Sequence, residues 1–210
     1  MGLLDRVYER SKKPISQDFI LIACCGKKRI GGSSYFSGSP VDSRLMEYRL
    51  ELAKILKLSP GRDVGDINHD SSLTFMSAIS RYHGNLYRAA RLPNSAKNFK
   101  GKLIIISALY GVIDMNDPVR EYQVTMKQRL PTGETIAQWW RKRSLGDIVA
   151  NKLIGAPLVH NFLSLDYQFA VDGQGMKSMS SNIRLYNYSK LGSGSNYYRG
   201  LDILKLLKGD

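Results

Sequence analysis

A run of four apolar residues, Leu103 to Ile106, constrains the fold of this chain more than any other segment. It is rich in β-branched side chains and bounded by Lys102 and Ser107, which is typical of a central strand covered on both faces. Ser107, Tyr110 and Gly111 then fall at the carboxyl end of that strand, where open α/β sheets collect ligands. Gly111 permits a positive φ or close backbone approach. A binding site and an ordinary turn both fit this pattern.

A second apolar run, Phe19 to Ala23, predicts another strand that ends in Cys24, Cys25, Gly26, Lys27 and Lys28. Adjacent cysteines rarely close a disulfide, so a disulfide framework is excluded. Nearby lysines could lower the pKa of Cys25 and make it redox-reactive, although both cysteines also fit as small apolar residues. With three scattered histidines and no Cys-x-x-Cys, the sequence predicts neither a metal site nor a cofactor.

Charge indicates the class of partner. The chain carries 31 Lys plus Arg against 18 Asp plus Glu, a formal net charge of +13. Basic residues gather at 27–29, 88–102 and 127–143, and such groups supply most of the non-specific affinity of proteins for nucleic acid. A polyanion-binding face is therefore expected, although a merely soluble basic surface has the same composition.

The loop after the first strand is rich in glycine and serine between residues 31 and 40. Such a loop can present backbone N–H groups, with Lys27 or Lys28, to an anion. It lacks the G-x-x-x-x-G-K-[ST] order of a Walker loop, which excludes an ATPase of that type. A solvated flexible connection is the alternative.

Helical spacing appears twice in the next segment, over 43–57 and again over 73–82, with Leu58 to Gly61 stopping the first helix. The pattern predicts a helix-hairpin-helix element. Such a hairpin can aim amides at a DNA phosphate, or can simply pack. After it, Tyr87 and Arg88 close a polar-aromatic cluster suited to stacking on bases and holding phosphates, or to forming a turn with one buried tyrosine.

Four later elements complete the expected fold. They are a long helix over 135–153 with core tryptophans, a strand over 158–161 followed by Asn161 and Ser164, a strand over 183–188 and a helix over 197–207. We predict one α/β domain over residues 1–210, with a mixed central sheet flanked by helices. No apolar run reaches the ~20 residues of a membrane span and the start lacks a secretory signal, so a cytoplasmic protein is expected.

Several separated segments resemble the YaaA family of peroxide-stress proteins, in the order expected for that family. The matching segments are Ala78-Ile79-x-x-Tyr82-x-Gly84-x-Leu86-Tyr87, Ser107 to Val112, Glu121 to Met126, Trp140, and Asn161 with Ser164 and Tyr167. The opening Cys25-Gly26-Lys27-Lys28 is more similar to YaaA-related proteins of mobile elements and nucleic-acid modification systems. The family's usual C-terminal segment is not recognisable after Asp172.

This resemblance implies a YaaA-like α/β fold with a basic cleft. It also implies double-stranded, possibly structured, DNA as the partner, bound through the helix-hairpin-helix around 50–70, and a role in limiting oxidative damage to DNA. Strand-end residues would form the cleft: Lys27 and Lys28 holding phosphate, Tyr87, Arg88, Tyr110 and Tyr122 contacting the ligand, and Ser107, Gly111, Asn161 and Ser164 shaping or orienting it.

Two further hypotheses stay open. The chain could be an enzyme that processes a nucleotide or nucleobase, as a glycosidase or transferase of a DNA-modification or defence system would, with Lys27 or Glu121 in acid-base or covalent work. Breaking a glycosidic bond would require a carboxylate or an activated water near the sugar, and Glu121, Asp114 or Asp166 could serve if the fold brings it there. The chain could also be a protein-interaction module whose basic surface is incidental.

Overall fold

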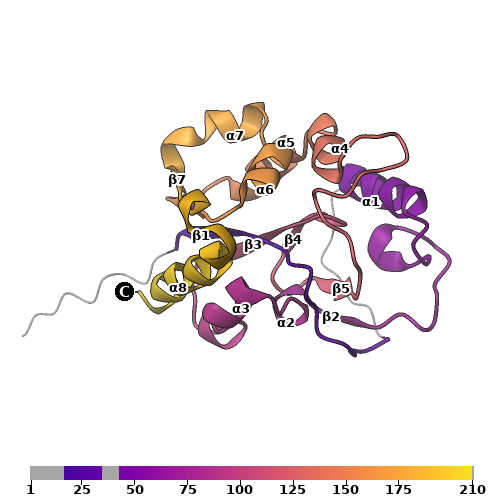
Figure 1. Cartoon of the computed structure of the whole chain (residues 1–210), viewed down its shortest axis with the longest axis horizontal. Helices are drawn as coiled ribbons and strands as arrows, with labels where there is room; N and C mark the ends of the chain where they lie inside the picture. Colours follow the sequence, from indigo (N-terminus) through magenta and orange to yellow (C-terminus); the bar gives the residue numbers. More distant parts are fainter. Residues whose placement is uncertain (1–16, 35–42, 210) are drawn as a thin grey trace, which may run out of the picture.

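The computed structural model describes residues 17–34 and 43–209 and has a mixed five-stranded sheet at its centre (Figure 1). The strand order is β4-β3-β1-β6-β7. β1 is parallel to β3 and β6, β6 is parallel to β7, and β4 is antiparallel to β3. The strands are β1 (Phe19–Ala23), β3 (Lys102–Ser107), β4 (Gly111–Asp114), β6 (Val159–Asn161) and β7 (Ile183–Leu185).

The expected mixed α/β fold is confirmed, and its two inner strands follow the two apolar runs. β1 and β3 align Ile20 with Leu103 and Ile22 with Ile105, and these four side chains are at most 3% exposed. Strands buried on both faces need such uninterrupted apolar runs, because every side chain points into a packed layer. In Figure 1, α5, α6 and α7 lie on one side of the sheet and α2 and α3 on the other, with α8 packed on α3.

Helices and short 3-10 turns connect the strands. The helices are α1 (Ser43–Ile55), α2 (Ala78–Arg81), α3 (Asn85–Ala89), α4 (Ile136–Lys142), α5 (Leu145–Leu153), α6 (Leu165–Ala170), α7 (Gln174–Ser178) and α8 (Ser195–Lys208). The 3-10 turns are η1 (Arg62–Val64), η2 (Asn94–Ala96), η3 (Ser180–Asn182) and η4 (Ser189–Gly194). Among the described residues, no helix is both long and apolar enough to cross a bilayer.

The helix expected over 73–82 is wrong in its first half. Phe75–Ser77 form strand β2, which pairs antiparallel with β5 (Pro118–Arg120), and only Ala78–Arg81 are helical. Pairing with a strand some 40 residues away overrides the local helical spacing. Arg81 reinforces the pair by donating to the carbonyls of Thr74 and Val119. The predicted helix-hairpin-helix is therefore not confirmed.

The helix expected over 135–153 is two helices, α4 and α5. Thr135 begins α4 with a capping box. The Thr135 side chain accepts a hydrogen bond from the Gln138 amide, and the Gln138 side chain accepts one from the Thr135 amide. The chain then breaks at Ser144, whose φ of 54° is left-handed. Trp139 and Trp140 are buried as expected, and Trp140 Nε1 donates to the Ala108 carbonyl at 2.9 Å.

Candidate functional site

The connections of the sheet diverge between β1 and β6. These neighbouring strands are parallel, but the chain after β1 continues to β3 on one side and the chain after β6 continues to β7 on the other. In open α/β sheets, a divergence of this kind marks the usual ligand site, outside the carboxyl ends of the two strands. The residues after β1 and β6, which include Cys24 to Lys28 and Asn161 to Ser164, lie at this place.

A buried polar group lies under the carboxyl ends of β1 and β3, and we call Lys28, Tyr82, Ser107 and Tyr122 the strand-end cluster. The Tyr122 hydroxyl is 2.7 Å from the Tyr82 hydroxyl and 2.8 Å from Ser107 Oγ. Ser107 Oγ also accepts from the amides of Leu109 and Tyr110. All four cluster residues are at most 8% exposed, so the cluster fixes the turn after β3 from beneath.

Lys28 is the cation of this cluster. Its Nζ lies 3.9 Å from the Tyr122 ring centroid and donates to the carbonyls of Cys25 at 2.9 Å and Gly26 at 3.3 Å. Burial lowers the pKa of Lys28, and the nearby Glu121 carboxylate opposes that shift. Glu121 itself is exposed. Because the Lys28 ammonium is held by carbonyls and aromatic rings, its expected contact with phosphate stays a prediction.

Tyr110 joins a buried ion pair next to the cluster. Its hydroxyl donates to Asp63 Oδ2 at 2.6 Å, and Arg120 Nε donates to the same oxygen at 2.7 Å. Burial and the Asp63 charge raise the pKa of Tyr110 well above its usual value. Sequence reasoning missed Asp63 and Arg120, because neither belongs to a local motif and only the packing of η1 on β5 brings them together.

The tyrosines predicted to contact ligand are enclosed. Tyr87, Tyr110 and Tyr122 are at most 4% exposed, and the Tyr87 hydroxyl donates to the Ala23 carbonyl at 3.0 Å. We therefore expect these rings to position the strand-end loops, and stacking on a base would require their exposure. Gly111 has a φ of +71°, as its turn demands, and an added Cβ would lie 2.8 Å from a Leu45 methyl carbon.

Two cysteines follow β1, and Cys25 is not activated by its lysine neighbours. Cys24 is buried with its Sγ 3.2 Å from the Tyr167 hydroxyl of α6. Cys25 Sγ accepts from the Gly84 amide at 3.2 Å, yet burial raises the pKa of this thiol to about 11. Of the two alternatives for Cys25, the depressed pKa is therefore wrong, because desolvation outweighs the nearby charge of Lys28.

Three exposed cations, Lys27, Arg29 and Arg88, lie around the half-buried His83, and we call these four residues the basic rim. The His83 amide donates to the Lys27 carbonyl at 3.0 Å, and Arg29 Nη2 lies 3.4 Å from His83 Nδ1. Partial burial and the charges of Arg29, Arg88 and Lys27 lower the pKa of His83. The fold thus brings together cations from two segments, after β1 and around α3.

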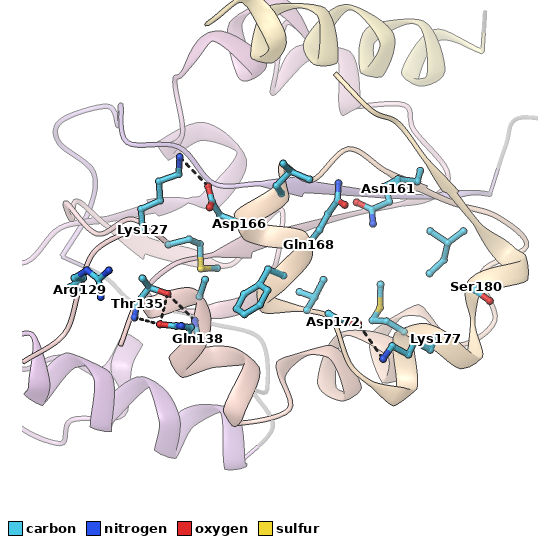
Figure 2. Close-up of a pocket in the computed structure, with 18 residues that line it drawn as sticks. Lys127, Arg129, Thr135, Gln138, Asn161, Asp166, Gln168, Asp172, Lys177 and Ser180 are labelled. Carbon is cyan, nitrogen blue, oxygen red and sulfur yellow. Dashed lines mark hydrogen bonds and ion pairs between the residues drawn. The ribbon is translucent and has the colours of Figure 1, made fainter. Parts of the chain in front are cut away.

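A cavity of about 930 Å³ opens beyond the carboxyl end of β6 (Figure 2). Asn161 lines it, as do apolar side chains of α6, α7 and β7. Two ion pairs lie on its wall, Lys127 with Asp166 at 3.5 Å and Lys177 with Asp172 at 3.7 Å. Sequence reasoning found only Asn161 and Asp166 here, because the other lining residues come from separated elements.

The predicted site residues thus divide among three places. Lys27 and Arg88 lie on the basic rim, Lys28, Ser107 and Tyr122 form the strand-end cluster, and Asn161 lines the cavity. Asn161 Oδ1 accepts from the Leu163 amide at 3.0 Å, which shapes the turn into α6, and Ser164 is the N-cap residue of that helix. Residues 35–40 of the glycine- and serine-rich loop lie outside the described residues.

Comparison with known proteins identifies relatives of this chain. The family model described as Peroxide stress protein YaaA matches residues 43–196. UPF0246 protein FN1762 of Fusobacterium nucleatum is 24% identical over 141 residues, which are 64% of this chain and 56% of that protein. UPF0246 protein lpl1317 of Legionella pneumophila is 24% identical over 190 residues, which are 76% of this chain and 73% of that protein. The chain thus spans little more than half of the first relative.

Proposed function

The chain belongs to the family of peroxide stress protein YaaA, and we propose that it binds duplex DNA through the basic rim and so limits peroxide damage to DNA. The observation that carries this proposal is the gathering of Lys27, Arg29 and Arg88 around His83 at the carboxyl edge of the sheet. Three cations on one edge can neutralise several backbone phosphates at once.

The net charge of +13 supports the same proposal. A basic surface attracts a polyanion over distances of about a Debye length, which is ~8 Å at physiological salt. Exposed lysine and arginine side chains then make the short-range phosphate contacts. Backbone contacts of this kind carry no base information, so we expect little dependence on DNA sequence.

The strand-end cluster gives the rim its rigidity. Lys28 lies between two rim residues in the sequence, and its buried ammonium anchors the segment to Tyr122 and to the carbonyls of Cys25 and Gly26. A segment fixed in this way loses little further conformational entropy when DNA binds. The buried tyrosines therefore do not contact DNA themselves. They contribute to binding by fixing the positions of Lys27 and Arg29.

A charge-matched comparison tests the proposal. The rim variant Lys27→Ala/Arg29→Ala/Arg88→Ala is compared with Lys54→Ala/Lys100→Ala/Lys208→Ala, which removes three exposed cations from elsewhere on the protein. In gel-shift titrations with duplex DNA, we expect the rim variant to lose at least tenfold more affinity than the control variant. In a plasmid-nicking assay with peroxide and iron, the rim variant should also lose protection. Equal losses in the two variants would contradict the proposal.

A second candidate function rests on the cavity. The fold brings Asp166, which the sequence had suggested as a possible carboxylate for glycosidic chemistry, into the wall that also carries Asn161 and Gln168. A pocket of this size suits a nucleoside or nucleotide, whose base two amide side chains could orient. The other candidates for catalysis, Lys27, Glu121 and Asp114, do not line this cavity.

Mass spectrometry tests this second candidate. Nucleosides, nucleotides and DNA are incubated with the wild type and with Asp166→Asn, which keeps the shape of the side chain but removes the carboxylate. A released base that forms with the wild type and not with the variant would support the enzyme hypothesis. Unchanged substrates with both proteins would exclude it for the compounds tested.

A further inference from the structure

The start of α8 has a glycine N-cap, as the starts of α3 and α7 do, and a buried arginine reaches it from within its own helix. Gly192-Ser193-Gly194, the end of η4, leads directly into this 14-residue helix, and its N-cap residue, Gly194, has no side chain to cap the first amides. The first turn also contains no acidic residue. The Ser195 amide already donates to the Gly192 carbonyl, and the helix dipole still makes this terminus favourable for an anion.

A buried arginine points at the same turn. Arg199 is only 7% exposed, and its Nη1 donates to Ser195 Oγ and to Asn196 Oδ1, each at 3.1 Å. Its Nε is buried and has no hydrogen-bond partner within the described part of the chain. No carboxylate of residues 17–34 or 43–209 forms an ion pair with it, and the Tyr188 ring lies 5.0 Å from its Cζ.

The other buried arginines of the protein are satisfied in a different way. Arg49 donates to two backbone carbonyls, Arg81 donates to three, and Arg120 pairs with Asp63. Within residues 17–34 and 43–209, Arg199 alone among these four donates to neither a carboxylate nor a backbone carbonyl. A buried guanidinium with an unsatisfied donor is unfavourable, so Arg199 points to an anion that arrives from outside this part of the chain.

Two exposed aromatic rings stand in the same turn. Tyr197 and Tyr198 are 50% and 48% exposed, and their ring centroids lie 5.6 Å apart in an edge-to-face arrangement. Exposed tyrosines beside a phosphate site are the combination with which proteins hold single-stranded nucleic acid, because every base offers a face for stacking. Inorganic phosphate has no aromatic ring that could stack on these tyrosines.

We propose that the first turn of α8 is a second nucleic-acid contact, at which Arg199, at the positive end of the helix dipole, binds a phosphate group of a single strand while Tyr197 and Tyr198 stack on its bases. This site shares no residue with the basic rim. It is nevertheless near an element of the rim, because α8 packs on α3 so closely that a Cβ on Gly200 would lie 2.4 Å from the Leu86 carbonyl (Figure 1). A strand leaving a duplex on the rim could therefore continue to α8.

The test is made in the rim variant Lys27→Ala/Arg29→Ala/Arg88→Ala, so that the outcome does not depend on duplex binding. A fluorescent single-stranded oligothymidylate is titrated against this protein alone and with Arg199→Met or Tyr197→Ala/Tyr198→Ala added. We expect Arg199→Met to weaken binding about tenfold, as the loss of a charged hydrogen bond would. The tyrosine pair should lose roughly tenfold for each stacked base.

Competition separates the possible sources of the phosphate. Inorganic phosphate and thymidine 5′-monophosphate are added to the same titration, and an oligonucleotide site should prefer the monophosphate to phosphate, a preference that Tyr197→Ala/Tyr198→Ala abolishes. Phosphate competing as well as the monophosphate in all proteins would overturn the nucleic-acid assignment.

A control covers the case in which Arg199→Met fails to fold. Arg199→Lys keeps the charge but loses the planar fork, and it should also bind the oligonucleotide more weakly. Phosphate should raise the melting temperature of the parent protein more than that of either Arg199 variant. If both variants bind the oligonucleotide as the parent does, Arg199 is purely structural and the proposal is wrong.

Discussion

The polar groups near the strand ends and those at the start of α8 both include buried cations but differ in how these charges are satisfied. Near the strand ends, Arg120 has a carboxylate partner in Asp63, and Lys28 has two carbonyls and a ring. At the start of α8, Arg199 is as buried as Lys28, but among the described residues its hydrogen-bond partners are only Ser195 and Asn196.

This contrast separates structural charge from charge that awaits a ligand. A closed network of donors and acceptors needs nothing more, and removing one member leaves the others unsatisfied. A network that lacks an acceptor for its buried cation is destabilising until an anion binds. Removing that cation should therefore change the free energy of unfolding of the ligand-free protein little. The predictions below test that difference, from the largest expected effect to the smallest.

The largest effect is expected for Asp63→Ala. This variant leaves the Arg120 guanidinium buried without its carboxylate and removes the acceptor of the Tyr110 hydroxyl. The free energy of unfolding should fall by about 3–5 kcal/mol, as for other broken buried ion pairs. Urea denaturation measures the loss, and Glu47→Ala, which removes an exposed carboxylate from α1, is the control. A loss within 1 kcal/mol of the control, roughly the effect of an ordinary surface change, would show that the network is not closed.

The second largest effect is expected for the alkylation rate of Cys25, which should be lower in the native protein than in the unfolded chain. Its pKa rises from 9.0 to about 11 on folding, so between these values the unfolded chain loses a proton that the folded chain keeps, and stability falls as pH rises. At pH 9 the fraction of Cys25 present as thiolate is therefore roughly fiftyfold lower in the folded protein than in the unfolded chain. Iodoacetamide labelling followed by peptide mass spectrometry should show native Cys25 slower by a similar factor. Equal rates in native and urea-unfolded protein would contradict the burial of this thiol.

A smaller effect is expected for Tyr122→Phe. The change keeps the ring under Lys28 but leaves the Tyr82 hydroxyl and Ser107 Oγ without their shared partner. Two weakened hydrogen bonds in a buried site should lower the free energy of unfolding by about 1–2 kcal/mol. Tyr48→Phe, on the half-buried Tyr48 of α1, is the matched control for the loss of a phenolic hydroxyl. A variant as stable as the wild type would mean that the strand-end cluster does not act as a network.

The smallest effect is expected for Arg199→Met in the absence of ligand. Methionine fills a similar volume and removes an unpaired buried charge, so the free energy of unfolding should change by less than about 1 kcal/mol or increase. Arg120→Met in the same urea experiment should be strongly destabilising, because it leaves the buried Asp63 carboxylate without its cation. Similar large losses for both variants would remove the distinction between the two regions.

How far the sequence predicts this structure depends on where the information lies. The apolar runs at 19–23 and 103–106 predict β1 and β3, because a strand buried on both faces must be apolar throughout. The local spacing over Phe75–Ser77 predicts a helix, but these residues form strand β2, because pairing with β5 decides their secondary structure. Ser144 likewise ends a helical pattern through a backbone conformation that its sequence does not announce.

The site was predictable only in part, for the same reason. Strand ends and turn residues indicate where a ligand could bind, and Lys27, Arg88 and Asn161, predicted in this way, lie on the basic rim and the cavity wall. The cavity, the Asp63–Arg120 pair and the state of Arg199 depend on contacts between distant elements. Cys25 shows the limit most directly, because its neighbours in the sequence predict a lower pKa and its burial produces a higher one.

The central claim is that the basic rim holds DNA phosphates, and the salt dependence of duplex binding tests it most directly. Association constants are measured over a range of salt for the wild type, the rim variant and the charge-matched variant at Lys54, Lys100 and Lys208. Each phosphate contact contributes about 0.9 to the slope of log K against log salt. The rim variant should therefore have a slope shallower by about 2.7, while the charge-matched variant keeps that of the wild type. Equal slopes for all three proteins would contradict the claim.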